Sequence, residues 1–258
     1  MMPYFTKVVL CSALMGFGFI SAAGTLGDIN DADFSGFYVG AGGSYIYSDI
    51  SGTSYATMST SPGYSQYPLV TIMTNHLAPI VDAGYYYNLN NHWLVGVKGL
   101  YKYIGSEQKA LDWSGTFPVT NTYQSAGLYT KLVQDFSLLL DGGYQFGHWL
   151  LYAGVGPGGA TAEFKLNGDV LAATSTYSMP VNMKTQTILW GGAAQVGVQY
   201  LLPNRFTVDL SYNFTATANT SLNTIIFPSY TNADHSSFDQ KLQIIEQGFN
   251  ITLTKFFW

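Results

Sequence analysis

Hydrophobic and polar residues alternate in eight separate segments of the chain. Each segment places aromatic or aliphatic side chains at every second position, and glycine, polar or charged residues at the positions between them. A period of two indicates a β-strand with two unlike faces. The segments span residues 37–48, 77–87, 93–103, 131–144, 149–164, 187–200, 206–214 and 245–257. The pattern therefore predicts an all-β chain with eight strands.

Apart from Lys255, the charged residues of these segments occur on one face. The other face is almost purely apolar and aromatic, whereas a soluble β-sandwich would expose charge there. An apolar outer face and a polar inner face are typical of a membrane barrel, whose closure leaves no backbone group unpaired in lipid. We therefore predict a transmembrane antiparallel up-and-down β-barrel of eight strands. Its lumen is predicted to hold a polar network of Asp82, Lys98, Lys102, Lys131, Asp135, Asp141, Asp209 and Glu246.

Finer assignments follow from the same alternation. Leu132 is predicted to face outward with Phe136. Beyond the Gly156–Gly159 segment, which contains a proline, the apolar positions move by one residue, so we predict a β-bulge that keeps Ala160, Ala162 and Phe164 outward. Pairing Tyr87 with Trp93 across the first short turn predicts that Asp82 lies directly opposite Lys98.

The connections between the strands alternate strictly between short and long. The short ones are Asn88–His92, Gly147–His148 and Leu201–Arg205, and the long ones are Asp49–Asn75, Gly105–Thr130, Leu166–Lys184 and Ala216–Asp239. Outer-membrane barrels have short periplasmic turns and long extracellular loops. Aromatic residues flank the short turns, which predicts a periplasmic aromatic girdle.

Composition agrees with a membrane location. The chain of 258 residues is 47% hydrophobic and 16% aromatic, and only 10% of it is charged, with a net charge of −5. Soluble domains contain roughly 25% charged residues. Nucleic-acid binding depends on Lys and Arg contacts to phosphates, and the ten Lys and Arg residues form no cluster. Nucleic acid is therefore not an expected partner.

The first residues are predicted to be a secretory signal peptide. Lys7 precedes the apolar run 8–20, and Ser21-Ala22-Ala23 provides the small residues of a cleavage site. We predict a cleaved signal peptide at 1–23 and a single barrel domain at 24–258. The only cysteine, Cys11, falls within the signal, so the mature chain has no disulfide.

Two segments resemble a known family. Ser35–Gly43 is similar to the glycine-rich first strand of opacity-like and OmpA-like barrels of the porin family. The C-terminus resembles the signal read by the outer-membrane assembly machinery, with Phe249, Ile251, Leu253, Phe257 and Trp258 as its residues; Lys255 departs from the pattern. The resemblance implies an outer-membrane location and architecture, and it specifies no activity.

An interior of eight strands is just wide enough for side chains to fill it. The lumenal charges are therefore interpreted first as a plug of ion pairs, and second as a gate in a narrow channel for small solutes. A third hypothesis is enzymatic. His235-Ser236-Ser237 followed by Glu246 is similar to the layout of lipid A deacylases, in which a histidine activates the serine. His76, His92 and His148 lack ligand spacing, so we predict no metal and no cofactor.

The long loops are rich in Ser, Thr, Asn, Tyr and Gly and nearly free of charge. Such surfaces suit adaptable protein or glycan contacts. We therefore predict a monomeric, non-enzymatic protein of the bacterial outer membrane with an adhesion-like role. Expected partners are membrane lipid and lipopolysaccharide, the barrel-assembly machinery, and a host-cell, matrix or glycan ligand.

Overall fold

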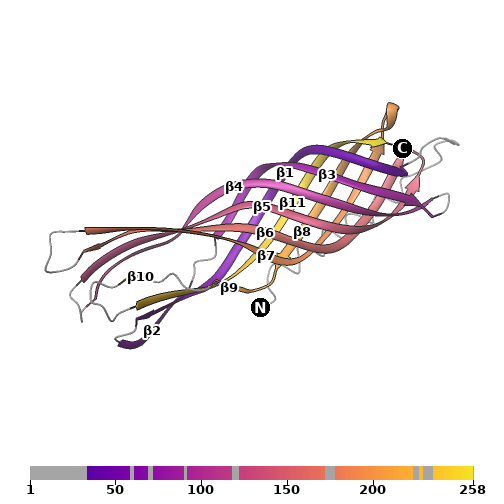
Figure 1. Ribbon diagram of the computed structural model, residues 1–258. Helices are drawn as coiled ribbons and strands as arrows, with labels where there is room; N and C mark the ends of the chain where they lie inside the picture. The colour runs from indigo at the N-terminus through magenta and orange to yellow at the C-terminus, as the bar shows by residue number, and fades with distance from the viewer. Residues whose placement is uncertain are drawn as a thin grey trace, which may run out of the picture. The chain divides into compact units, whose positions relative to one another are not determined.

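The computed structural model describes residues 34–58, 61–68, 72–89, 92–117, 122–171, 178–222, 227–228 and 235–257. Eight long antiparallel strands form a closed ring in the order β1, β3, β4, β5, β6, β7, β8 and β11 (Figure 1). Their bounds are β1 Gly36–Met58, β3 Ile72–Asn88, β4 Trp93–Phe117, β5 Thr122–Phe146, β6 Trp149–Leu171, β7 Ser178–Leu201, β8 Phe206–Thr217 and β11 His235–Phe257. The predicted all-β barrel is confirmed.

Closure comes from pairing the first strand with the last. β1 and β11 run antiparallel from the pair Phe37 and Phe257 to the pair Met58 and Ser236. Short strands continue the ring strands: β2 Ser61–Pro68 beside β1, and β9 Thr220–Leu222 and β10 Phe227–Pro228 beside β11. One 3-10 turn, η2 at Pro203–Arg205, precedes β8. Among the described residues, no helix has the length and hydropathy needed to cross a bilayer.

The two faces of the wall differ as predicted. Outward side chains such as Val97 (47% exposed) and Ile251 (61% exposed) are apolar. The inward residues next to them in the chain, such as Lys98 and Thr252, are buried. This alternation places hydrocarbon-compatible side chains outside and polar ones inside over the turn-side half of the barrel.

The short turns are also confirmed. β3 and β4, β5 and β6, and β7 and β8 are joined directly by the three short connections. Aromatic pairs flank them on the outer face: the rings of Trp93 and Tyr144 are 5.1 Å apart, and those of Trp149 and Tyr200 are 4.6 Å apart. These pairs form the girdle expected at the periplasmic interface.

The long connections differ from expectation, because most of their residues belong to strands. β4 and β5 continue as a hairpin to Phe117 and Thr122, and β6 and β7 continue to Leu171 and Ser178. The wall also divides at two seams. In the described residues, only the part of β3 from Ile80 to Asn88 pairs with β4. Likewise, only the part of β7 from Gly191 to Leu201 pairs with β8. Beyond the seams β4, β5, β6 and β7 form one sheet, while β1 and β11 pair with β2, β9 and β10 (Figure 1).

The predicted pairing of β3 with β4 is wrong by two residues. Tyr87 lies opposite Val95 instead of Trp93, and Lys98 lies opposite Gly84 instead of Asp82. The two charged groups still approach each other diagonally, with 3.9 Å between Lys98 Nζ and Asp82 Oδ2.

The predicted bulge in β6 is also wrong. β6 pairs with β7 without interruption from Trp149 to Leu171, so Ala160, Ala162 and Phe164 face the interior. The irregularity lies instead in β5 and β4. Relative to β6, β5 has one extra residue at position 133. Relative to β4, the same position faces two residues, at 104 and 105.

This bulge reverses the phase of the first half of β5. Leu132 is buried inside, and Lys131 therefore faces outward, opposite to our prediction for both. Gly105 adopts a φ of 64° there, a left-handed conformation that glycine tolerates best.

Candidate functional site: the barrel interior and the extracellular strands

Aromatic side chains fill the turn end of the interior. Tyr38 and Tyr86 stack with ring centroids 5.2 Å apart, and Phe256 lies 5.1 Å from Tyr38. Phe34 packs edge-on against Phe256 at 6.1 Å. All four are fully buried. This aromatic layer closes the barrel on the side of the short turns.

Above it lies a group that we name the turn-side ionic cluster, made of Lys98, Asp82, Asp141 and Asp209. Lys98 Nζ donates to Tyr152 Oη at 3.0 Å and to Asp209 Oδ2 at 3.2 Å. The Tyr152 hydroxyl donates to the same Asp209 carboxylate at 2.8 Å. The cluster joins β3, β4, β5 and β8, and Tyr152 adds β6, so its contacts cross the barrel as well as linking neighbours.

The next group is the loop-side ionic cluster, made of Lys102, Asp135 and Glu246. Lys102 Nζ donates to Asp135 Oδ2 at 3.0 Å and also to Glu246 Oε1. Thr215 donates to Asp135 at 3.2 Å. The three charged side chains are at most 1% exposed. Since removing charges from water is costly, the two carboxylates depend on the single ammonium group.

An apolar layer follows toward the loop side. It is formed by inward side chains of every ring strand except β8: Ile46, Ile50, Ala78, Ile104, Leu132, Ala160, Ala162, Phe164, Leu189, Leu242 and Ile244. The sequence reading missed this layer, because it assumed that every inward position is polar. The described interior thus contains aromatic, ionic and apolar layers in succession.

Seven of the eight predicted lumenal residues lie inside and are at most 4% exposed. They separate into the two ionic clusters. Inward tyrosines missed by the sequence reading complete the turn-side cluster, and each faces an inward glycine across a strand pair. Tyr38 pairs with Gly84, Tyr86 with Gly96, and Tyr152 with Gly197. A tyrosine opposite a glycine at inward positions is the signal that could have revealed them.

The eighth residue, Lys131, belongs to an outer group that we name the rim cluster, with Glu107, Glu163, Lys165 and Lys184. Lys165 Nζ lies 2.6 Å from Glu107 Oε2, and Lys184 Nζ lies 2.9 Å from Glu163 Oε2. The hydrogen bond from Lys184 lowers the pKa of Glu163. These charges follow the last apolar outward residues of the strands, so they mark the extracellular boundary of the hydrocarbon band.

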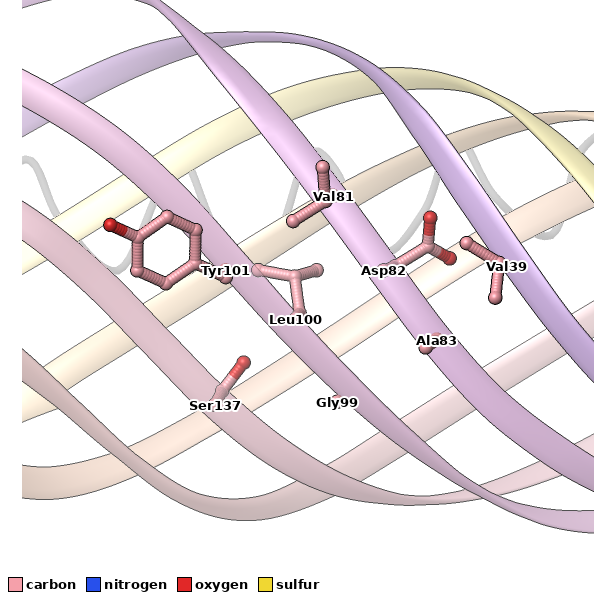
Figure 2. A pocket seen from close by; sticks show the side chains of 8 residues that line it. All are labelled: Val39, Val81, Asp82, Ala83, Gly99, Leu100, Tyr101 and Ser137. Carbon is pink, nitrogen blue, oxygen red and sulfur yellow. The ribbon is translucent and has the colours of Figure 1, made fainter.

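A shallow hollow of about 420 Å³ lies in the apolar band of the outer wall. Ala83 and Gly99, which pair across β3 and β4, form its base, and Val39, Val81 and Tyr101 flank it (Figure 2). Its lining is largely apolar, and Asp82 and Ser137 also border it.

The residues of the predicted assembly signal lie on β11. Phe249, Ile251, Leu253 and Phe257 are exposed on its outer face. Lys255 bends toward the turn, with Nζ 4.5 Å from the centre of the Phe206 ring. Trp258 and the proposed signal peptide lie outside the described residues. Recognition by the assembly machinery stays a prediction.

The structure does not assemble the predicted enzymatic arrangement. Glu246 binds Lys102 inside the barrel, and His235 is eleven residues earlier on the same strand. At about 3.3 Å per residue, this separation is about 36 Å. Glu246 therefore cannot orient His235. In the described part of the chain, no three His, Cys, Asp or Glu side chains gather in a group that could hold a metal ion.

Comparisons with known proteins give one family. The model described as "Outer membrane protein beta-barrel domain" matches residues 9–237. No curated protein matches the chain significantly. Among solved structures, the attachment invasion locus protein Ail of Yersinia pestis is 15% identical over 80% of this chain and 98% of its own, with a TM-score of 0.32. Neisserial surface protein A is 14% identical over 82% of this chain and 96% of its own, with a TM-score of 0.30. The outer membrane protease OmpT of Escherichia coli is 10% identical over 91% of this chain and 99% of its own, with a TM-score of 0.40.

Proposed function

Because the chain belongs to the outer membrane protein β-barrel domain family, and so to the bacterial outer membrane, we propose that it is a non-enzymatic surface-interaction protein. Its extracellular strands bind a ligand of a host cell, of the matrix or of glycan type. The observation that supports this most directly is the length of the strands. Hairpins such as that of β4 and β5 continue well beyond the rim cluster.

The divided wall adds a reason. Beyond the seams, the edge of β4 that faces β3 and the edge of β7 that faces β8 have no strand partner among the described residues. Unpaired strand edges present backbone donors and acceptors that extended chains can bind. The Ser, Thr, Asn and Tyr residues of these segments suit neutral polar contacts.

The interior favours this proposal over a channel. Two ionic clusters lie between an aromatic layer and an apolar layer, and their side chains are buried. Conduction needs a hydrated path, and the aromatic and apolar layers enclose the charged groups on both sides. We expect the protein to give no discrete conductance steps in planar bilayers, and regular steps altered by Lys98 or Asp135 substitution would favour the channel.

Binding is tested with the purified full chain in nanodiscs on immobilised cells, matrix proteins and glycan arrays. The test variant replaces residues 109–128 with a short Gly-Ser turn, which removes the distal hairpin of β4 and β5. The matched control replaces only the Gly147-His148 turn at the opposite end. We expect the first variant to lose binding while both keep the heat-dependent gel mobility of a folded barrel. Unchanged binding after removal of each distal hairpin in turn would refute the proposal. A changed lipid A mass spectrum on overexpression would favour an enzyme.

A further inference from the structure

A row of four inward positions crosses neighbouring strands in the turn-side half of the barrel. Thr207 on β8 pairs with Thr254 on β11, Thr254 pairs with Gly40 on β1, and Gly40 pairs with Asp82 on β3. Antiparallel partners on one face have adjacent side chains. Gly40 has none, so the side chains on either side of it meet in the space above its backbone.

The oxygen atoms that meet there have no hydrogen-bond partner among the described residues. These atoms are both carboxylate oxygens of Asp82 and the hydroxyl oxygen of Thr254; the hydroxyl of Thr207, one strand beyond Thr254, also has no partner. All three residues are at least 96% buried. Asp82 Oδ1 and Thr254 Oγ1 both crowd the position that a Cβ on Gly40 would occupy. Figure 2 shows the Asp82 carboxylate directed from β3 toward β1.

The nearest ammonium group does not satisfy Asp82. Lys98 uses its three N–H groups on Tyr152, Asp209 and Gln195, at 3.0, 3.2 and 3.4 Å. Its distance of 3.9 Å to Asp82 is too long for a hydrogen bond. A buried carboxylate without a donor is costly, and protein structures rarely leave one so.

The charge of the interior is also unbalanced. The turn-side cluster has one lysine and three aspartates, a net charge of −2. The loop-side cluster has one lysine and two carboxylates, so with every group ionised the two clusters together have a formal net charge of −3. Both lysines are already engaged, so the protein itself supplies no further buried cation in this part of the chain.

We propose that Asp82 and Thr254 bind a small monovalent cation above Gly40, with the Thr207 hydroxyl next in the same row. Carboxylate and hydroxyl oxygens are hard ligands, which suit Na⁺ better than a transition metal. One carboxylate matches one positive charge, whereas a divalent ion usually takes more carboxylates. The bound ion reduces the excess negative charge and gives the unpartnered oxygens their contact. The site is separate from the extracellular strands and does not depend on the proposed surface function.

The experiment measures urea unfolding of the full-length protein in detergent, in NaCl or choline chloride at equal ionic strength. A ligand that binds only the folded state stabilises it by RT ln(1 + [L]/Kd). We expect the urea midpoint to rise with the logarithm of Na⁺ concentration and to be insensitive to choline. Each tenfold step in Na⁺ above Kd should add about 1.4 kcal/mol to the unfolding free energy.

The variant Asp82→Asn removes the carboxylate with little change in volume and is expected to abolish the Na⁺ dependence. Asp135→Asn changes the interior charge equally in the other cluster and is the matched control, which keeps the dependence. If Asp82→Asn does not fold, Thr254→Val tests the same site, and broadening of the ²³Na resonance by the wild-type protein tests binding directly. Equal midpoints in both salts would overturn the proposal, and so would a Na⁺ dependence that survives in Asp82→Asn. Stabilisation by acid in place of Na⁺ would also overturn it, because it would identify a proton as the occupant.

Discussion

Replacement of Lys102 by methionine tests whether one ammonium group holds the loop-side ionic cluster together. Methionine keeps most of the side-chain length and removes the charge. In the wild type, Lys102 Nζ lies 3.0 Å from Asp135 Oδ2 and also contacts Glu246. At an effective dielectric constant of about 20, a pair at this distance is worth about 5 kcal/mol. Measured losses on breaking a buried pair are about 3–5 kcal/mol.

We expect Lys102→Met to lie at the upper end of that range, because it leaves two buried carboxylates without their cation. The assay is urea unfolding in detergent, followed by tryptophan fluorescence and by the fraction of heat-modifiable species on gels. The matched control is Lys165→Met, which breaks an outer-face pair and is expected to cost less than about 1 kcal/mol.

The triple variant Lys102→Met, Asp135→Asn, Glu246→Gln separates loss of charge pairing from loss of packing. It removes all three charges of the cluster at similar volume, so we expect it to recover most of the stability lost in the single variant. If Lys102→Met unfolds within about 1 kcal/mol of wild type, or if the triple variant is no more stable than the single one, our electrostatic reasoning is wrong.

Two further predictions concern packing and the rim. Gly197→Val drives a side chain into the ring of Tyr152 and should cost about 1–3 kcal/mol of unfolding free energy, whereas Gly192→Ala faces open space and should cost far less, as urea titration can measure. The hydrogen bond with Lys184 lowers the pKa of Glu163, so the stability from this contact is present above the ordinary carboxyl pKa and is lost as pH falls through the lowered value. Lys184→Ala should move the pKa of Glu163 back up in an NMR titration. An unmoved pKa would contradict the assignment.

Alternation identified the strands and the inward charges because the turn-side half of the barrel has two unlike faces. Asp209, for example, lies between Val208 and Leu210, which face lipid. The same logic failed in the loop-side half, where Ala160 and Phe164 are apolar and inward. There the outward neighbours, such as Glu163 and Lys165, are polar, so the pattern is inverted and alternation alone assigns the two faces the wrong way round.

Register and bulge position could not be read from the sequence for a related reason. The pairing of β3 with β4 depends on where Tyr86 finds room, and that room is the missing side chain of Gly96. The bulge depends on the left-handed conformation of Gly105 rather than on the proline of β6, because Pro157 faces outward and simply lacks an N–H group to pair. Both are properties of two strands together, which a single segment does not reveal.

The order of the interior layers explains why a costly ionic centre is kept. Lys98 and Lys102, both on β4, bind carboxylates on β8 and β11, which lie across the barrel. A slip of β4 by one residue would turn both lysines into the hydrocarbon and strand the carboxylates inside. An apolar interior would accept such a slip at far lower cost, since the wall is apolar on its other face as well. We infer that the ionic clusters specify strand register, and that stability comes largely from the layers on either side of them. On this reasoning the triple variant at the loop-side cluster keeps its unfolding free energy but gives more than one folded species, a heterogeneity visible as duplicated amide resonances of β4.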